Sequence, residues 1–228
     1  MPTLTFDCVA DSATRTISFE AENLVLAGLT GRDQTAVQHH VDELQELGIA
    51  PPSTIPIFYR TGVELVTQAD RLQVLGPHTS GEVEYVLLVT EDSIWFTVGS
   101  DQTDRKAEAI DIALSKQLAG KVIARTAWNL AEYAGRWDSL MMRSWATIEG
   151  ERVLYQETAL ANVLDPDDLI GRYTSGGTLA PGTVMMSGTP AAIGGIRPGT
   201  RFEIELADEA AGRNITHAYD IDVLPVIA

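Results

Sequence analysis

Glycine and proline break the sequence into short apolar or alternating stretches, and this punctuation constrains the fold more than any single motif. The stretches are rich in β-branched and aromatic residues and are bounded by turn residues, which is typical of strands. They lie at residues 3–9, 16–30, 57–59, 63–67, 72–75, 81–90 and 93–98. The pattern predicts a mostly-β protein of the α+β class. A length of 228 residues without a recognisable linker predicts a single domain over residues 1–228.

Only a few stretches favour helices. Residues 33–48 carry apolar side chains at helical spacing and end at Gly48. Residues 103–120 predict a second helix. Residues 165–177 predict a third, short helix, for which Asp165 can serve as the N-cap because a proline occupies the first helical position after it.

Charge and cysteine content exclude several functional classes. The formal net charge is −16, and phosphate contacts need Lys and Arg, so we expect no binding to nucleic acid or to an anionic membrane. Cys8 is the single cysteine, so no intrachain disulfide can form, which favours a reducing compartment. The N-terminus lacks a basic region followed by an apolar run, and no apolar run reaches membrane-spanning length. We therefore expect a cytoplasmic protein.

The stretch "GEVEYVLLVT" at 81–90 combines a buried-strand pattern with two carboxylates. Side chains at positions i and i+2 of a strand point to the same face, so Glu82 and Glu84 should stand side by side. Their charges repel each other against a strand that is apolar enough to be buried. The simplest interpretation is two solvated carboxylates on an edge strand of an unrelated β protein.

Asp101 favours a different interpretation, because it ends the next apolar run. If the two runs form an antiparallel hairpin, Asp101 returns to the start of the first strand, and three carboxylates converge there. A hard divalent cation would relieve their repulsion, and oxygen ligands suit Mg²⁺, Mn²⁺ or Ca²⁺. Few histidines and one cysteine make a zinc site a poor alternative.

A second candidate group is "HHVDE" at 39–43. His40 and Glu43 are three residues apart on one face of the predicted helix, so the carboxylate could orient an imidazole that acts as a general base. His39 and Glu43 are four apart and equally well placed, so spacing alone does not choose between the two histidines. The alternative is a set of solvated side chains on an acidic helix.

The remaining candidates are weaker when taken singly. The glycine-rich stretch 187–199 could aim backbone N–H groups at an anion, with Thr189 adding a hydroxyl, or it could be an ordinary tight turn. Lys121 could neutralise an anionic substrate or cap the preceding helix. Arg32 and Arg105 could bind a substrate carboxylate or form surface ion pairs.

The order of these pieces resembles that of the catalytic domain of the fumarylacetoacetate hydrolase superfamily. The resemblance runs from about residue 23 to the end. Its most specific part is the Gly-Thr-Pro turn. This turn is followed by a Pro-Gly pair and then by a strand in which apolar and polar residues alternate. The matching pieces are "GR" (31–32), "HVDE" (40–43), "PPSTIPIFYR" (51–60), "EVE" (82–84), "DQTDR" (101–105), Lys121 and "SGTPAAIGGIRPGTRFEIEL" (187–206).

The resemblance implies a fold, a metal site and a base. The fold would be the mixed β-sandwich roll of that family's C-terminal domain with a few short helices, assembled as a homodimer. Glu82, Glu84 and Asp101 would bind Mg²⁺ or Mn²⁺, with Ca²⁺ as a third candidate. The base would be His40 rather than His39, paired with Glu43 on a segment that orders over the substrate. The other site residues would be Lys121 in catalysis and Arg32, Arg105, Gly188 and Thr189 in substrate binding.

The activity implied by the resemblance is hydrolysis of a C–C bond in an acylpyruvate-like or related 2-oxo acid, a small carboxylate substrate. The metal would stabilise the enolate as a Lewis acid, and a separate base would activate water. Decarboxylation or keto–enol isomerisation would use the same site, and a non-catalytic ligand-binding protein would retain only the fold and metal. Departures from the family pattern at Asp33, Gln34, Arg60 and Glu108 predict a divergent branch.

Overall fold

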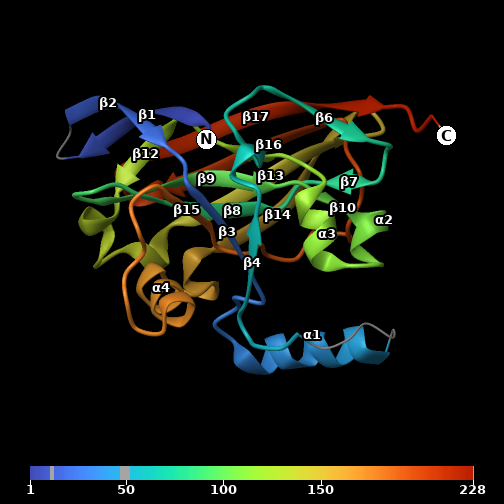
Figure 1. The fold of residues 1–228 in the computed structure, drawn as a ribbon, viewed down its shortest axis with the longest axis horizontal. Helices are drawn as coiled ribbons and strands as arrows, with labels where there is room; N and C mark the ends of the chain where they lie inside the picture. Colours follow the sequence, from blue (N-terminus) through green and yellow to red (C-terminus); the bar gives the residue numbers. More distant parts are fainter. Residues whose placement is uncertain (11–12, 47–51, 228) are drawn as a thin grey trace.

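The computed structural model describes residues 1–10, 13–46 and 52–227. Within these ranges the protein consists mainly of strands, arranged in two large sheets, with four short α-helices at their margins (Figure 1). The predicted mostly-β, α+β class with a few short helices is confirmed. No helix in the described ranges combines the length and apolar character needed to cross a membrane.

The first sheet is mixed, because it contains both parallel and antiparallel neighbours. For example, β1 is parallel to β12 whereas β8 is antiparallel to β9. Its order is β2 (Ala13–Glu20), β1 (Thr3–Ala10), β12 (Thr126–Asn129), β9 (Ile94–Asp101), β8 (Val83–Val89), β15 (Thr183–Met186), β3 (Asn23–Gly28) and β4 (Ile57–Thr61). A short strand, β11 (Lys121–Ile123), pairs with β9 and also with β5 (Val66–Thr67).

The second sheet is built mainly from the C-terminal third of the chain. Its order is β14 (Glu151–Ala159), β13 (Met141–Ile148), β16 (Arg201–Asp208), β17 (Arg213–Leu224) and β6 (Arg71–Leu75). A separate two-stranded ribbon pairs β7 (Thr79–Ser80) with β10 (Thr103–Asp104). This ribbon continues the chain directly before β8 and directly after β9, so it lies at the end of that hairpin where Glu82 and Asp101 are found.

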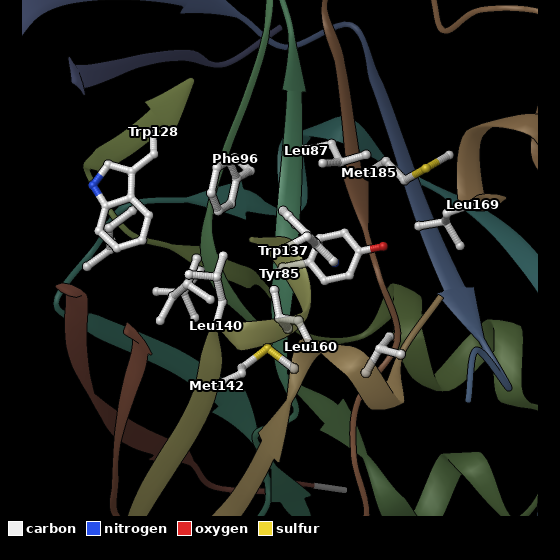
Figure 2. Packing of buried hydrophobic residues seen from close by; sticks show 14 of the residues in the cluster. Tyr85, Leu87, Phe96, Trp128, Trp137, Leu140, Met142, Leu160, Leu169 and Met185 are labelled. Atoms are coloured by element: carbon white, nitrogen blue, oxygen red, sulfur yellow. The ribbon is translucent and has the colours of Figure 1, made fainter. Parts of the chain in front are cut away.

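Side chains from both sheets form the main hydrophobic core. Tyr85 and Phe96 of the first sheet share one cluster with Met142 and Ile204 of the second. Figure 2 shows Tyr85, Phe96 and Trp137 at the centre of this cluster, and Phe96 and Trp137 lie with ring centroids 5.1 Å apart. Aromatic side chains bury large apolar areas, so this cluster holds β8 and β9 firmly in register.

The helices confirm two predictions and correct a third. Helix α1 (Gln34–Glu46) and helix α4 (Pro166–Thr174) form where expected, and the Asp165 side chain caps α4 by accepting a hydrogen bond from the Asp168 N–H at 2.9 Å. The predicted end of the first helix at Gly48 lies outside the described residues.

The continuous helix predicted over 103–120 is wrong. The segment instead contains β10, helix α2 (Arg105–Glu108) and helix α3 (Ile112–Gln117). Asp111 separates the two helices, because its extended backbone and its side chain, which accepts from the Leu114 N–H at 2.7 Å, make it an N-cap. The strand predicted over 63–67 is also only partly right, since residues 63–65 form a 3₁₀ turn before β5.

Candidate metal centre

The two glutamates of the stretch 81–90 lie on one face of the first sheet. Along β8, Val83, Tyr85 and Leu87 point into the core between the sheets, while Val86 and Leu88 point into a second cluster on the opposite face. Because side chains alternate along a strand, Glu82 and Glu84 share the face of Val86 and Leu88. Both are buried, with residue exposures of 8% and 1%. They are therefore not solvated edge groups.

Asp101 joins them through the antiparallel pairing of β8 with β9. The Asp101 N–H donates to the Glu82 carbonyl at 2.9 Å, and Gly99 lies opposite Glu84. Asp101 is fully buried, and one carboxylate oxygen from each of the three residues lies within 4.8 Å of the other two. The predicted convergence of Glu82, Glu84 and Asp101 is therefore present in the structure, and we refer to these residues as the acidic triad.

Lys121 lies directly across from Asp101, because these residues are register partners in the β9–β11 pair. Its Nζ is 2.7 Å from Asp101 Oδ1 and donates to the Gln102 carbonyl at 2.8 Å, and its side chain is fully buried. Burial lowers the pKa of Lys121, although Asp101 opposes this effect. Lys121 begins a strand, so the interpretation as a solvated helix cap is wrong.

Lys116 is a further cation at the triad, and it was missed in the sequence. Its Nζ lies 2.6 Å from Asp101 Oδ2 and 3.0 Å from Glu82 Oε2. Burial lowers the pKa of Lys116, but the carboxylates of Asp101 and Glu82 outweigh burial and raise it above its usual value. Its signal in the sequence is its place fifteen residues after Asp101, and the continuous helix expected over 103–120 conceals that signal.

Arg105 binds the outer side of Glu82. Its guanidinium is 2.9 Å from Glu82 Oε1 and 2.8 Å from Glu108 Oε2, and its Nε donates to Ser80 Oγ at 2.7 Å. Burial would raise the pKa of Glu82, but Lys116 and Arg105 reverse this effect and lower it to about 2. Arg105 therefore holds a triad carboxylate in this structure rather than projecting freely on the surface.

Glu84 has a different environment from the other two carboxylates. Its Oε2 accepts a hydrogen bond from the Gly188 N–H at 2.8 Å, and no ion pair to Glu84 is seen in the part of the chain that the structure describes. Burial raises the pKa of Glu84 well above its usual value, and the nearby Asp101 carboxylate adds to this effect. Gly188 adopts a φ of +85°, and a Cβ there would lie 2.4 Å from Thr30 Oγ1, so this turn requires glycine.

Thr189 anchors the same turn to β8. Its hydroxyl donates to the Val83 carbonyl at 3.0 Å and accepts from Gln156 Nε2 at 2.7 Å. Gly188 and Thr189 thus reach the triad strand as the sequence order suggested. Their observed partners are protein groups, so their assignment to substrate binding stays a prediction.

Within the described residues, Arg32 makes no contact with the acidic triad. Its guanidinium donates to the Val163 carbonyl at 2.7 Å and pairs with Asp138 at 2.7 Å, and a second carboxylate, Asp165, lies 3.8 Å away. These contacts match the surface ion-pair interpretation. A role for Arg32 in substrate binding remains a prediction.

His40 and Glu43 fall on α1, as predicted, but their side chains lie outside what the structure describes. Val37 and Val41 are buried and attach this helix to the rest of the protein. Figure 1 shows α1 beyond the end of β4, apart from the two sheets. The base dyad therefore remains a prediction about two residues on one face of α1.

The donor set of the triad fits a hard divalent cation. It offers carboxylate oxygens from Glu82 just before β8, from Glu84 on β8 and from Asp101 on the adjacent β9, and oxygen ligands of this kind suit Mg²⁺, Mn²⁺ and Ca²⁺. The Lys116 ammonium now bonds two of the three carboxylates. Any ion held by all three must therefore share the triad with Lys116 or replace it.

Replacing Lys121 with methionine should lower the free energy of unfolding by about 3 kcal/mol, because it leaves the buried Asp101 with one cationic partner fewer. Urea denaturation measures the change. Lys106→Met, at an exposed position on α2, is the matched control and should change stability by less than about 0.5 kcal/mol. A loss below about 1 kcal/mol in Lys121→Met would show that this ion pair does not stabilise the fold.

The sequence matches a family model described as "Protein of unknown function (DUF2848)" over residues 27–219. No protein of curated function matches it significantly.

Several solved structures share the fold at low identity. A fumarylacetoacetate hydrolase family protein from yeast is 18% identical with a TM-score of 0.61, covering 91% of this chain and 95% of its own. A 5-carboxymethyl-2-hydroxymuconate delta-isomerase from Mycobacterium smegmatis is 16% identical with a TM-score of 0.61, covering 92% and 81%. A 2-keto-3-deoxy-D-arabinonate dehydratase, complexed with magnesium and 2,5-dioxopentanoate, is 12% identical with a TM-score of 0.64, covering 91% and 75%. The resemblance to the fumarylacetoacetate hydrolase superfamily is thus confirmed at the level of the fold.

Proposed function

Because this chain belongs to the DUF2848 family and has the fold of fumarylacetoacetate hydrolase family proteins, we propose that it is a divalent-metal-dependent enzyme acting on a 2-oxo acid. The observation that carries the proposal is the buried acidic triad of Glu82, Glu84 and Asp101. Three buried carboxylates at one place are costly unless cations neutralise them. A solved structure of the same fold holds magnesium and a dicarbonyl acid, which supports this choice of cofactor and substrate class.

The reaction we propose is hydrolysis of a C–C bond in an acylpyruvate-like or related 2-oxo acid. Mg²⁺ or Mn²⁺, when bound, would supply a Lewis acid for the negative charge that develops on the substrate. The triad would hold the ion, with the Gly188 N–H orienting Glu84 and with Lys121 and Arg105 orienting Asp101 and Glu82.

The residues of α1 would supply the base. We assign His40 to remove a proton from the attacking water and Glu43 to orient and stabilise the imidazole. The i to i+3 spacing on a formed helix supports this pairing. By its resemblance to the same superfamily, we further propose that the protein is a cytoplasmic homodimer acting on a small carboxylate, with one catalytic domain over residues 1–228.

A second candidate function uses the same residues without an attacking water. This alternative is decarboxylation or keto–enol isomerisation. Two of the solved structures that share this fold are described as an isomerase and a dehydratase, so proteins of this fold also include enzymes that are not described as hydrolases. In that case the α1 histidine would shuttle a proton, and its removal would cost less.

The identity of the products tests the proposal. The protein with Mn²⁺ is incubated with an acylpyruvate and, separately, with oxaloacetate. Products are identified by mass spectrometry, and keto–enol isomerisation, which leaves the mass unchanged, is followed by proton NMR. Hydrolysis consumes one water and yields two carboxylic acids, whereas decarboxylation releases CO₂. Binding of both compounds without turnover of either would contradict the enzyme assignment and favour a ligand-binding protein.

A further inference from the structure

Lys116 occupies the position of a counter-cation within the acidic triad. Its ammonium bonds Asp101 Oδ2 at 2.6 Å and Glu82 Oε2 at 3.0 Å, and it approaches the Thr103 hydroxyl at 3.4 Å. Contacts of this length to two carboxylates are strong, charge-assisted hydrogen bonds. A divalent ion coordinated by the same two carboxylates would place its charge against the ammonium in a buried environment, where like charges repel strongly.

The other two cations at the triad are held in place by additional groups. Lys121 is fixed on strand β11 and also donates to the Gln102 carbonyl at 2.8 Å. Arg105 also bonds Ser80 and Glu108. The observed polar partners of Lys116, by contrast, are Glu82, Asp101 and Thr103, all at the triad itself. Within the described residues, Lys116 can therefore leave the triad without breaking a polar contact to a group outside it.

The location of Lys116 also permits its release. It lies on α3, a helix of only six residues that stands beside β10 at the margin of the sheets (Figure 1). The residues that follow it, Gln117 and Leu118, are exposed. A lysine side chain has four rotatable carbon bonds, so its ammonium can move towards solvent while the helix stays in place.

Charge balance gives the reason for such an exchange. The three triad carboxylates and Glu108, which also pairs with Arg105, face three cationic side chains, Arg105, Lys116 and Lys121, in the described part of the chain. The cluster therefore carries one formal negative charge without a metal. Adding a divalent ion would leave one excess positive charge, and release of Lys116 removes it. Buried net charge is strongly unfavourable, so binding of the ion favours release.

From these contacts, we propose that Lys116 is an exchangeable counter-cation, which neutralises the triad in the metal-free protein and is displaced when a divalent metal binds. This inference rests on the proposed function, because it takes the triad to be the metal site. It adds that the chain sets its own metal affinity through a competing side chain. The site would then fill at a higher concentration of free metal than it would without Lys116.

Mn²⁺ binding to the full-length, metal-free chain tests the exchange. The concentration of free Mn²⁺ is measured by electron paramagnetic resonance in solutions of wild type, Lys116→Gln and the matched control Lys106→Gln. We expect Lys116→Gln to bind Mn²⁺ at least about tenfold more tightly than wild type, because no ammonium has to leave. Lys106→Gln makes the same change in net charge at an exposed position of α2, and its affinity should stay within about twofold of wild type.

Two results would overturn the inference in different ways. If wild type binds Mn²⁺ through the triad and Lys116→Gln binds no more tightly, Lys116 is not a competitor, and the proposed function stands. If neither protein binds Mn²⁺, the triad is not a metal site, and both the inference and the proposed function fail.

If Lys116→Gln does not fold, a measurement on the wild-type protein tests the exchange instead. Lysine acetylation is followed by peptide mass spectrometry with and without saturating Mn²⁺. Displacement predicts that modification of Lys116 rises at least about threefold on metal addition, because its ammonium is buried at the triad without metal. Modification of the exposed Lys106 should not change. Continued protection of Lys116 at saturating Mn²⁺ would contradict the exchange.

Discussion

Glu84→Gln should lower the affinity for Mn²⁺ by at least about a hundredfold, since loss of even an indirect metal contact typically costs 10–100-fold. Glu84 is the best triad position for this test, because no ion pair to it is seen among the described residues and a glutamine amide oxygen can still accept from the Gly188 N–H. Burial raises the pKa of Glu84, because the charged carboxylate is poorly solvated there, and glutamine removes that charge without changing the size of the side chain. The variant should therefore keep its stability while losing the metal.

The matched control is Glu91→Gln, in the exposed turn at the other end of the β8–β9 hairpin. It removes the same charge and should leave Mn²⁺ affinity within about twofold of wild type. Binding is measured by isothermal titration calorimetry, and thermal melting confirms folding. Undiminished Mn²⁺ binding by a folded Glu84→Gln would exclude Glu84 as a ligand.

His40→Ala should reduce turnover by on the order of 10²–10⁴, the usual contribution of a general base, while Mn²⁺ affinity stays unchanged. Turnover and metal affinity should respond separately, because the proposed metal ligands lie on or next to β8 and β9, whereas His40 lies on α1. Turnover is measured under saturating Mn²⁺ with whichever 2-oxo acid the product assay identifies.

His39→Ala is the natural control, because His39 is the neighbouring histidine at equally suitable spacing from Glu43. The assignment of His40 predicts a change below about threefold for His39→Ala, far short of a general base's contribution. If His39→Ala loses turnover and His40→Ala does not, the base is His39. If both variants keep full turnover, α1 does not supply the base.

The acidic triad could be predicted from the sequence because strand geometry alone places it. Alternation puts Glu82 and Glu84 on one face, and a short connection between two apolar runs requires the antiparallel pairing that returns Asp101 to them. Both rules are local, so they need no knowledge of the rest of the fold.

The cations around the triad could not be placed in the same way. Lys121 was interpreted as a possible helix cap, but it pairs with Asp101 on β11, and that pairing depends on where the chain returns after α3. Lys116 reaches the triad from α3, a separate short helix that begins after its N-cap Asp111, and the sequence pattern did not predict this second helix start. Arg32, by contrast, pairs with Asp138, a residue more than a hundred positions away in the sequence.

Calorimetric titration of oxalate into the metal-stripped protein, with and without Mn²⁺, tests the central claim most directly. Oxalate resembles the planar enolate of a 2-oxo acid and can occupy coordination positions that the triad leaves open on a bound ion. The account predicts oxalate binding that requires Mn²⁺ and that disappears in Glu84→Gln. Oxalate binding that is equal with and without Mn²⁺, or absent in both conditions, would contradict a metal-dependent 2-oxo acid site at Glu82, Glu84 and Asp101.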